Sequence, residues 1–265
     1  AEDEARGGGG VDTLDEAGRT PLMHAAGDGD IEGLRLLMSQ GAAVNARDEC
    51  RCTALMYAAT YGHLEAVRCL ACFGAEVEAR SQDGWTPLIT AAYNGHLPTV
   101  QCLLEHGAYV EAADERGWTS LMHVAFNGDN ETLRCLLEHG AQVDALDTDG
   151  RDALVYAAFN GHHENARCLI ECTSAEAAAK AQADGARDTA LLFAAIRGHE
   201  EVLRLLLQAC PARPETRQAA QKLAADHGHA AVVELLSSAS SARPNGAVAA
   251  PAPELTPPGH GGGHC

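Results

Sequence analysis

The side chains most able to do chemistry in this chain belong to ten cysteines and thirteen histidines. Both residue types can ligate metals, and cysteines can form disulfides. Their spacing favours another interpretation, because many of them return at one place in a repeating pattern. The cysteines that do so are Cys69, Cys102, Cys135 and Cys168, and the histidines that do so, each after the glycine of its repeat, are His63, His96, His162, His199 and His229.

The recurring cysteine position is interpreted as a buried aliphatic position. Leucine takes it in other repeats, as Leu36 and Leu205, and a free cysteine packs like a small apolar side chain. The Cys50–Cys52 and Cys69–Cys72 pairs lack a second pair at the spacing of a zinc site. We therefore expect no metal, no cofactor and free thiols, which favours a reducing compartment.

Catalytic motifs are absent from the sequence. It has no glycine-rich phosphate loop, no His-Glu-x-x-His motif, and no pair of carboxylates in a recognisable catalytic context. The histidines that follow a glycine are expected to be structural. The sequence therefore predicts that this chain is not an enzyme.

The elements that position these residues follow a fixed period. Five leucines lie 33 residues apart, and Gly-Ala pairs and a second set of glycines return at the same step. Three independent marks on one period predict a repeat array instead of a domain with a single core. The leucines are Leu22, Leu55, Leu88, Leu121 and Leu154.

Each repeat is expected to hold two short helices. Thr86 suits the N-cap of the first helix, and Pro87 suits its first position. Gly95 and Gly107 are expected to end the first and second helices, because glycine readily adopts the left-handed conformation of a helix C-cap. The stretch after Gly107 is expected to be extended and to turn back.

This pattern resembles the ankyrin repeat over about residues 11 to 236. The motifs that carry the resemblance are Gly84-Trp85-Thr86-Pro87-Leu88, Ala91-Ala92-Tyr93-Asn94-Gly95-His96 and Leu103-Leu104-Glu105-His106-Gly107-Ala108. The resemblance implies an all-α solenoid of stacked helix-turn-helix units with hairpin fingers. Stacking is required, because one unit cannot bury its own apolar face.

We expect six repeats and a degenerate C-terminal cap over Ala219 to Leu236, where Gln221 replaces the repeated leucine. The step from Leu154 to Leu191 is 37 residues, so an extended helix or irregular connection is expected at 171–187. Residues 1–10 are expected to be a flexible leader and 237–265 a disordered tail. The repeats start near Asp12, Asn45, Glu78, Glu111, Asp144 and Ala181.

The candidate binding residues are aromatic. Ankyrin-like arrays usually bind partners on a concave side made of finger tips and exposed first-helix positions, and nine of eleven aromatic residues fall on such positions here. Phe73 and Tyr109 are the exceptions. Tyr93, Phe126 and Phe159 could instead be core residues between repeats. The candidates for contact with a partner are Trp85, Trp118, Tyr93, Phe126, Tyr156, Phe159, Tyr57 and Tyr61.

The charge of the chain indicates the kind of partner. The formal net charge is −18, and acids such as Asp83, Asp114 and Glu115 lie near the expected finger tips. This favours a basic or amphipathic polypeptide and disfavours nucleic acid, whose binding depends on clustered Lys and Arg. No stretch is apolar for long enough to span a membrane.

The sequence therefore predicts a monomeric scaffold or adaptor in the cytoplasm or nucleus, bound to a polypeptide across repeats two to five. One alternative is a regulatory inhibitor that masks a basic segment, or a substrate-recognition subunit of a ubiquitin ligase. Another is the targeting arm of a longer enzyme such as a kinase, which the start at Ala1 leaves open.

Overall fold

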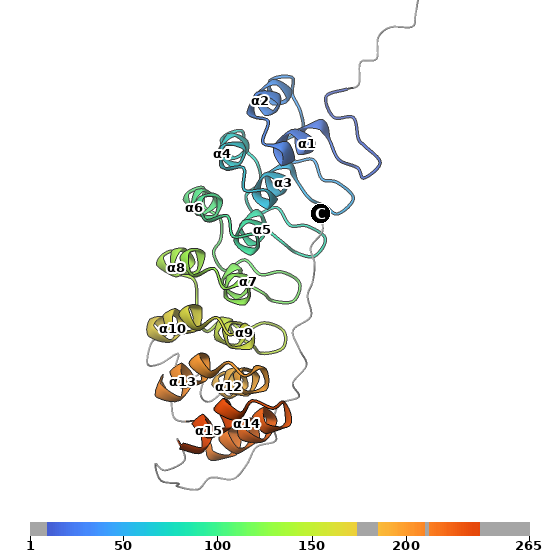
Figure 1. The fold of residues 1–265 in the computed structure, drawn as a ribbon. Coiled ribbons are helices and arrows are strands. Elements are labelled where there is room, and N and C mark those ends of the chain that lie inside the picture. The colour runs from blue at the N-terminus through green and yellow to red at the C-terminus, as the bar shows by residue number, and fades with distance from the viewer. Residues whose placement is uncertain (1–9, 174–184, 210–211, 239–265) are drawn as a thin grey trace, which may run out of the picture. The chain divides into compact units, whose positions relative to one another are not determined.

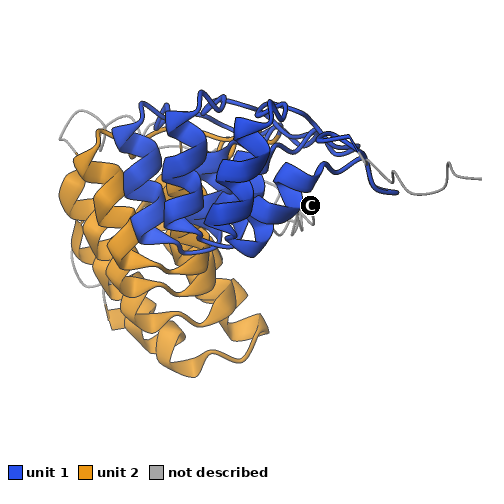
Figure 2. Ribbon diagram, turned by 90° about the horizontal axis from the view of Figure 1, so that it is seen from above, with its two compact units in different colours: residues 1–115, 263–265 blue, residues 116–262 orange. Residues whose placement is uncertain are grey.

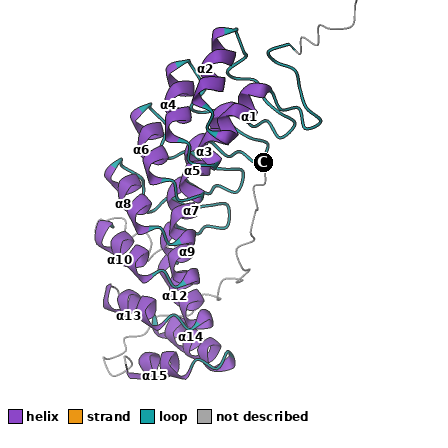
Figure 3. Ribbon diagram, turned by 45° about the horizontal axis from the view of Figure 1, so that its top comes forward, coloured by secondary structure: helices purple, strands orange, loops and turns teal. Residues whose placement is uncertain are grey.

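The computed structural model describes residues 10–173, 185–209 and 212–238, and these residues hold fourteen helices and no β-sheet (Figure 1 and Figure 3). The expected all-α class is confirmed. The helices are α1 (Pro21–Asp28), α2 (Ile31–Ser39), α3 (Ala54–Thr60), α4 (Leu64–Cys72), α5 (Pro87–Tyr93), α6 (Leu97–Glu105), α7 (Ser120–Asn127), α8 (Asn130–Glu138), α9 (Ala153–Asn160), α10 (His163–Cys172), α12 (Ala186–Arg197), α13 (Glu200–Ala209), α14 (Pro214–Asp226) and α15 (Ala230–Ser238).

The chain divides into two compact units, which are described separately (Figure 2). The described part of unit 1 is residues 10–115, and that of unit 2 begins at Arg116. In unit 1 the first helices of the repeats, α1, α3 and α5, pack in one row and the second helices, α2, α4 and α6, in another. In unit 2 the corresponding rows are α7, α9, α12, α14 and α8, α10, α13, α15.

The first helix of the third repeat, α5, begins where the sequence predicts. The Thr86 hydroxyl accepts the backbone N–H of Ile89 at 3.3 Å, and Pro87 occupies the first turn. This cap satisfies one of the backbone donors that a helix start leaves without a partner. The helix buries Leu88, Ala91 and Ala92 completely or nearly so. Small alanines on this face allow the neighbouring first helices to approach closely.

Successive repeats are joined by the histidines that follow glycine. In unit 1, His63 Nε2 lies 2.9 Å from the carbonyl oxygen of Gly27, and in unit 2, His162 Nε2 lies 2.9 Å from that of Phe126. Each imidazole also covers a glycine of the preceding repeat. A β-carbon at Gly128 would lie 2.5 Å from His162 Nδ1, which no side chain could tolerate. The expected structural role of these histidines is confirmed.

The fingers are the loops that lead from each second helix to the next first helix. Backbone hydrogen bonds join neighbouring fingers in unit 1. The Gln82 N–H donates to the Cys50 carbonyl at 2.8 Å, and the Glu115 N–H donates to the Asp83 carbonyl at 3.1 Å. These bonds satisfy loop groups that no helix can satisfy, so each finger lies in a defined register on the one before it.

One finger tip departs from the pattern of the others. Arg51 has φ +63°, the one non-glycine residue with positive φ in the described part of the chain. Glycine holds the equivalent place in other fingers, with φ between +73° and +81°. The left-handed conformation costs an L-residue roughly 1–2 kcal/mol, so this turn carries backbone strain. The glycines are Gly18, Gly84, Gly117 and Gly150.

The irregular junction lengthens a helix. Thr189 has the place that an N-cap threonine has in earlier repeats, yet it lies inside α12, with its hydroxyl 3.1 Å from the Gly185 carbonyl. Because α12 begins at Ala186, it has twelve residues against eight in α9. Much of the expected junction, residues 174–184, and the predicted repeat start at Ala181 lie outside the described residues.

The last described unit is a helix pair, α14 and α15. The pair begins at Pro214, five residues before the predicted start at Ala219, and ends at Ser238. Lys222 is exposed and Gln221 half-buried, in keeping with a polar last unit. Nearly all of the predicted leader and tail, residues 1–9 and 239–265, lies outside the described residues.

Replacing Arg51 by glycine relieves the strain at this finger tip. We expect Arg51→Gly to raise the free energy of unfolding by about 1 kcal/mol, because glycine adopts positive φ without a steric penalty. Urea unfolding followed by circular dichroism measures the change. The matched control is Gly150→Arg, where a β-carbon meets no atom within 4 Å and φ is +74°. Gly150→Arg should lower the free energy of unfolding by a similar amount. If neither variant changes the urea midpoint, the Arg51 turn is not strained.

Candidate functional site

Several finger turns are held by a side chain at one recurring position, which accepts the backbone N–H of the residue four positions later. Asp48 accepts from Cys52 at 2.7 Å, and Asp147 accepts from Arg151 at 2.8 Å. In the third repeat the Ser81 hydroxyl does the same for Trp85 at 3.1 Å. These acids therefore shape the fingers and are unavailable as simple surface charges.

Two of these acids also hold a tyrosine of the next first helix. The Tyr57 hydroxyl donates to Asp48 at 2.6 Å, and the Tyr156 hydroxyl donates to Asp147. Burial and then the adjacent carboxylate raise the pKa of both tyrosines well above the usual range. Each phenol therefore stays protonated and serves as a donor that links a helix to its finger.

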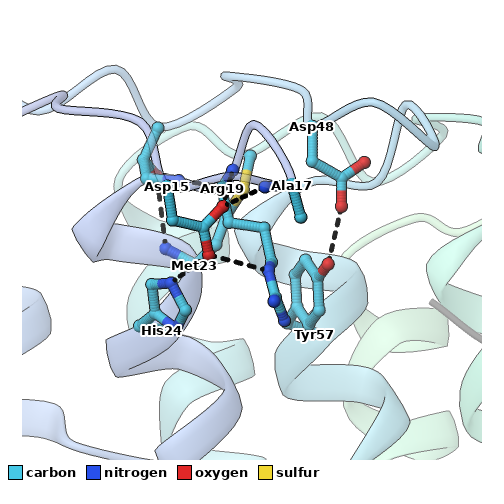
Figure 4. Close-up of polar contacts among 8 residues, drawn as sticks. Asp15, Ala17, Arg19, Met23, His24, Asp48 and Tyr57 are labelled. Carbon is cyan, nitrogen blue, oxygen red and sulfur yellow. Dashed lines mark hydrogen bonds and ion pairs between the residues drawn. The ribbon is translucent and has the colours of Figure 1, made fainter.

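The first repeat makes the same link with a histidine (Figure 4). His24 Nε2 and Arg19 Nε lie 2.9 Å and 3.1 Å from the same Asp15 oxygen. The backbone N–H of Arg19 donates to the other oxygen at 2.9 Å. Led by that backbone bond, these contacts lower the pKa of Asp15 to about 2. The arrangement is an exposed ion-pair cluster at the start of unit 1.

This first-helix position was expected to be exposed, and the expectation is wrong for every repeat except the first. Tyr57 and Tyr156 are buried because their hydroxyls point to the finger acids. These two tyrosines are too buried to form much of a contact surface themselves. The residues at this position are His24, which is exposed, and Thr90, His123 and Phe193, which are buried like the tyrosines.

Trp118 was also expected to be exposed, and it is buried. Its ring centroid lies 4.1 Å from that of Tyr156 and 5.6 Å from that of Phe126. Only 8% of its surface is accessible. In unit 2 the tryptophan therefore packs as the centre of an aromatic cluster instead of projecting to solvent.

Unit 1 has the accessible aromatic surface. Trp85 and Tyr93 are both half-buried, with ring centroids 5.0 Å apart and planes at 69°. We call these two residues the aromatic pair. Tyr61 is 56% exposed, and its ring covers the small Gly27 of the preceding repeat. Because rings that meet edge to face do not cover each other's faces fully, a half-buried pair still presents aromatic surface to a ligand.

The surroundings of the aromatic pair are acidic. Exposed Asp83 and Glu115 come from consecutive fingers that are hydrogen-bonded to each other. The described part of unit 1 has sixteen acidic residues against six arginines and no lysine. The resulting negative potential attracts cationic side chains to half-exposed rings.

Unit 2 presents rings that arginines of the same chain already cover. The Arg197 guanidinium carbon lies 4.8 Å from the centroid of half-buried Phe159, and that of Arg151 lies 5.8 Å from Phe193. The two phenylalanines meet edge to face at 5.3 Å. Half-buried Phe126 lies in the Trp118 cluster. The unit 2 rings are therefore poorer sites for a partner's cation than the aromatic pair is.

The contacts of these two arginines with the rings were not expected from the sequence. Arg151 precedes the cap of α9, and Arg197 ends α12, both at positions counted as part of the surface. The ring partners lie on the next or the preceding repeat, so no local spacing reveals them. These pairs could have been predicted from one feature of the sequence. An arginine stands just before the cap of a first helix or at its end, and an aromatic residue stands on the first helix of a neighbouring repeat.

These helix pairs, joined by fingers, define a helical repeat solenoid. The family model for ankyrin repeats in three copies matches residues 5–81, 22–114, 73–145 and 110–181, and the model for a single ankyrin repeat matches 187–217. The chain belongs to the ankyrin repeat family, whose repeats are protein–protein interaction modules that are typically not catalytic. No curated protein matches the chain.

Within the described residues, the recurring cysteine position was expected to be buried, and this is wrong for three of the repeats. Cys69 and Leu205 are half-buried and Leu36 is 58% exposed, whereas Cys102, Cys135 and Cys168 are buried. The eight cysteines there are free, and four of them are exposed or half-buried. No cluster of three His, Cys, Asp or Glu residues in the described ranges is arranged to hold a metal ion. None of the helices in those ranges is both long and apolar enough to cross a bilayer.

The burial of Tyr156 predicts a role in stability. We expect Tyr156→Phe to lower the free energy of unfolding by about 1–3 kcal/mol, because Asp147 loses a donor in a buried site. Urea unfolding measures the difference. Tyr61→Phe is the control, since that side chain is exposed, and it should change stability by less than about 0.5 kcal/mol. Equal effects in the two variants would contradict the structural role.

Proposed function

We propose that the protein is a non-enzymatic adaptor whose unit 1 binds a basic polypeptide segment at the aromatic pair. The observation that carries the proposal is the half-exposed Trp85–Tyr93 pair beside exposed Asp83 and Glu115. Tryptophan and tyrosine commonly supply much of the binding energy at interfaces. A cationic side chain would stack on the accessible ring surface and pair with the finger acids.

The rest of the proposed surface follows from exposure. Tyr61 extends it toward the preceding repeat, because more than half of that side chain is accessible. In unit 2, Phe126 packs against Trp118 and Phe159 is covered by Arg197, so neither ring is assigned to this surface. Tyr57 is buried in unit 1 and supports its finger through Asp48, whereas Trp118 and Tyr156 belong to the aromatic cluster of unit 2. This differs from the sequence expectation, in which all eight aromatic residues contact the partner.

Regulation by masking a basic segment is the second candidate function, and the excess of acids in unit 1 favours it. A masking inhibitor depends mainly on charge, so its affinity falls steeply with salt. Binding through the aromatic pair depends mainly on ring contacts, so its affinity falls only slightly as the salt concentration rises. Measurement of the dissociation constant over about a tenfold range of salt, roughly 50 to 500 mM, distinguishes charge masking from binding through the aromatic pair.

The proposed setting is the cytoplasm or nucleus, with the module acting as a monomer. Free cysteines support a reducing compartment, where disulfides are rare. Targeting of a longer enzyme remains compatible with the same surface, because such an arm would bind its partner in the same way.

Loss of the aromatic pair should abolish recognition. We expect Trp85→Ala and Tyr93→Ala each to weaken selected peptides at least about tenfold, as removal of a central aromatic anchor does. The peptides come from a random twelve-residue display library selected on the folded protein, and they should be rich in Arg and Lys. Fluorescence polarisation gives the dissociation constants.

The matched controls are Phe73→Ala and Tyr109→Ala, since these side chains are 54% and 60% exposed and lie outside the proposed surface. They should leave affinity unchanged. The proposal is wrong if the Trp85 and Tyr93 variants keep full affinity while circular dichroism shows an intact fold, or if the selected peptides are not basic.

A further inference from the structure

Arg197 is unusual among the arginines of unit 2. It is exposed at the C-terminal end of α12, with its guanidinium carbon 4.8 Å above the Phe159 ring. An arginine stacked in this way keeps the N–H donors in its plane available, and the ring restricts its motion. A guanidinium held in one orientation loses less entropy when it binds an anion.

Several arginines of unit 2 are paired with carboxylates of the same chain. Arg151 lies 3.3 Å from Asp149, Arg213 lies 3.3 Å from Asp188, and Arg204 pairs with Glu200. Within the described ranges, no carboxylate oxygen lies within ion-pair distance of Arg197. Its charge is therefore available to a ligand from outside the chain.

The floor of the Arg197 site is rigid and apolar. Phe159 meets Phe193 edge to face at 5.3 Å, and Arg151 covers Phe193. Asn160, next to Phe159, donates to the Phe126 carbonyl at 2.8 Å and so ties this helix to the preceding one. These contacts fix Phe159, and with it the guanidinium that lies on it.

The charge at this place differs between the units. The equivalent helix-end residues of unit 1 are Asp28, Tyr61 and Asn94. Those of unit 2 are Asn127, Asn160, Arg197 and, in the last helix pair, His227. The balance of charge also differs, since the described part of unit 2 has ten basic residues against fifteen acids. Unit 2 therefore offers a positive site that unit 1 lacks at this position.

We propose that unit 2 binds the carboxylate of an Asp or Glu residue of a polypeptide partner at Arg197, beside the Phe159 ring. Because Arg151 and Arg213 are neutralised by Asp149 and Asp188, the site offers one unpaired positive charge. One charge matches a carboxylate, whereas a doubly charged phosphate group usually requires several cations. This site is separate from the aromatic pair of unit 1.

Nuclear magnetic resonance of the full chain labelled with ¹⁵N-arginine tests the site. The probes are acetyl-Gly-Phe-Glu-Gly-amide and its counterparts with Gln or phosphoserine in place of Glu. We expect the Glu peptide to shift the Arg197 Nε–Hε signal in a saturable way, and the Gln peptide to bind at least about tenfold more weakly. Arg197→Gln identifies the signal and should abolish binding of the Glu peptide.

Further variants test whether the Phe159 ring and the place of the charge both matter. Phe159→Leu should weaken binding of the Glu peptide, because the guanidinium loses its ring, whereas Arg204→Gln on the second helix α13 should leave it unchanged. Trp85→Ala should also leave it unchanged, so failure here is distinct from failure of the unit 1 proposal. Equal binding of the Glu and Gln peptides, tighter binding of phosphoserine, or full affinity in Arg197→Gln would each overturn the carboxylate site.

Discussion

Within each unit, the close stacking of successive repeats positions every other element of the structure. Within each unit the histidine after glycine donates to a carbonyl of the preceding repeat, as His96 does to Thr60 at 3.0 Å. The same ring occupies the space that a side chain on Gly62 would need. Because the bond and the contact both come from His96, a single substitution at His96 removes both.

Stacking also determines which aromatic residues remain for a partner. Where a finger has an aspartate, as at Asp48 and Asp147, the phenol nine residues later binds it and becomes buried. In the third repeat, Ser81 and Thr90 replace that pair, and the Thr90 hydroxyl donates to the Thr86 carbonyl instead. The tryptophan of this repeat is the one that stays half-exposed.

The fold could be predicted from the sequence because the period repeats local signals: Thr86 caps a helix, and Gly107 has the positive φ expected after the second helix. The site could be predicted only in part. Burial of Trp118 results from its contact with Tyr156, 38 residues away, and the Arg197–Phe159 pair spans the same separation. Such contacts depend on side-chain directions between neighbouring repeats, and helical spacing within one repeat does not contain that information.

We propose that the two tryptophans have different roles: Trp85 belongs to a binding surface, and Trp118 belongs to the scaffold. Acrylamide quenching of fluorescence in Trp118→Phe and Trp85→Phe, each of which keeps one tryptophan, tests it most directly. The account predicts that Trp85 is quenched several-fold more efficiently than Trp118, since it is half-buried and Trp118 is 8% exposed. Equal quenching, or stronger quenching of Trp118, in variants with intact circular dichroism would contradict the account.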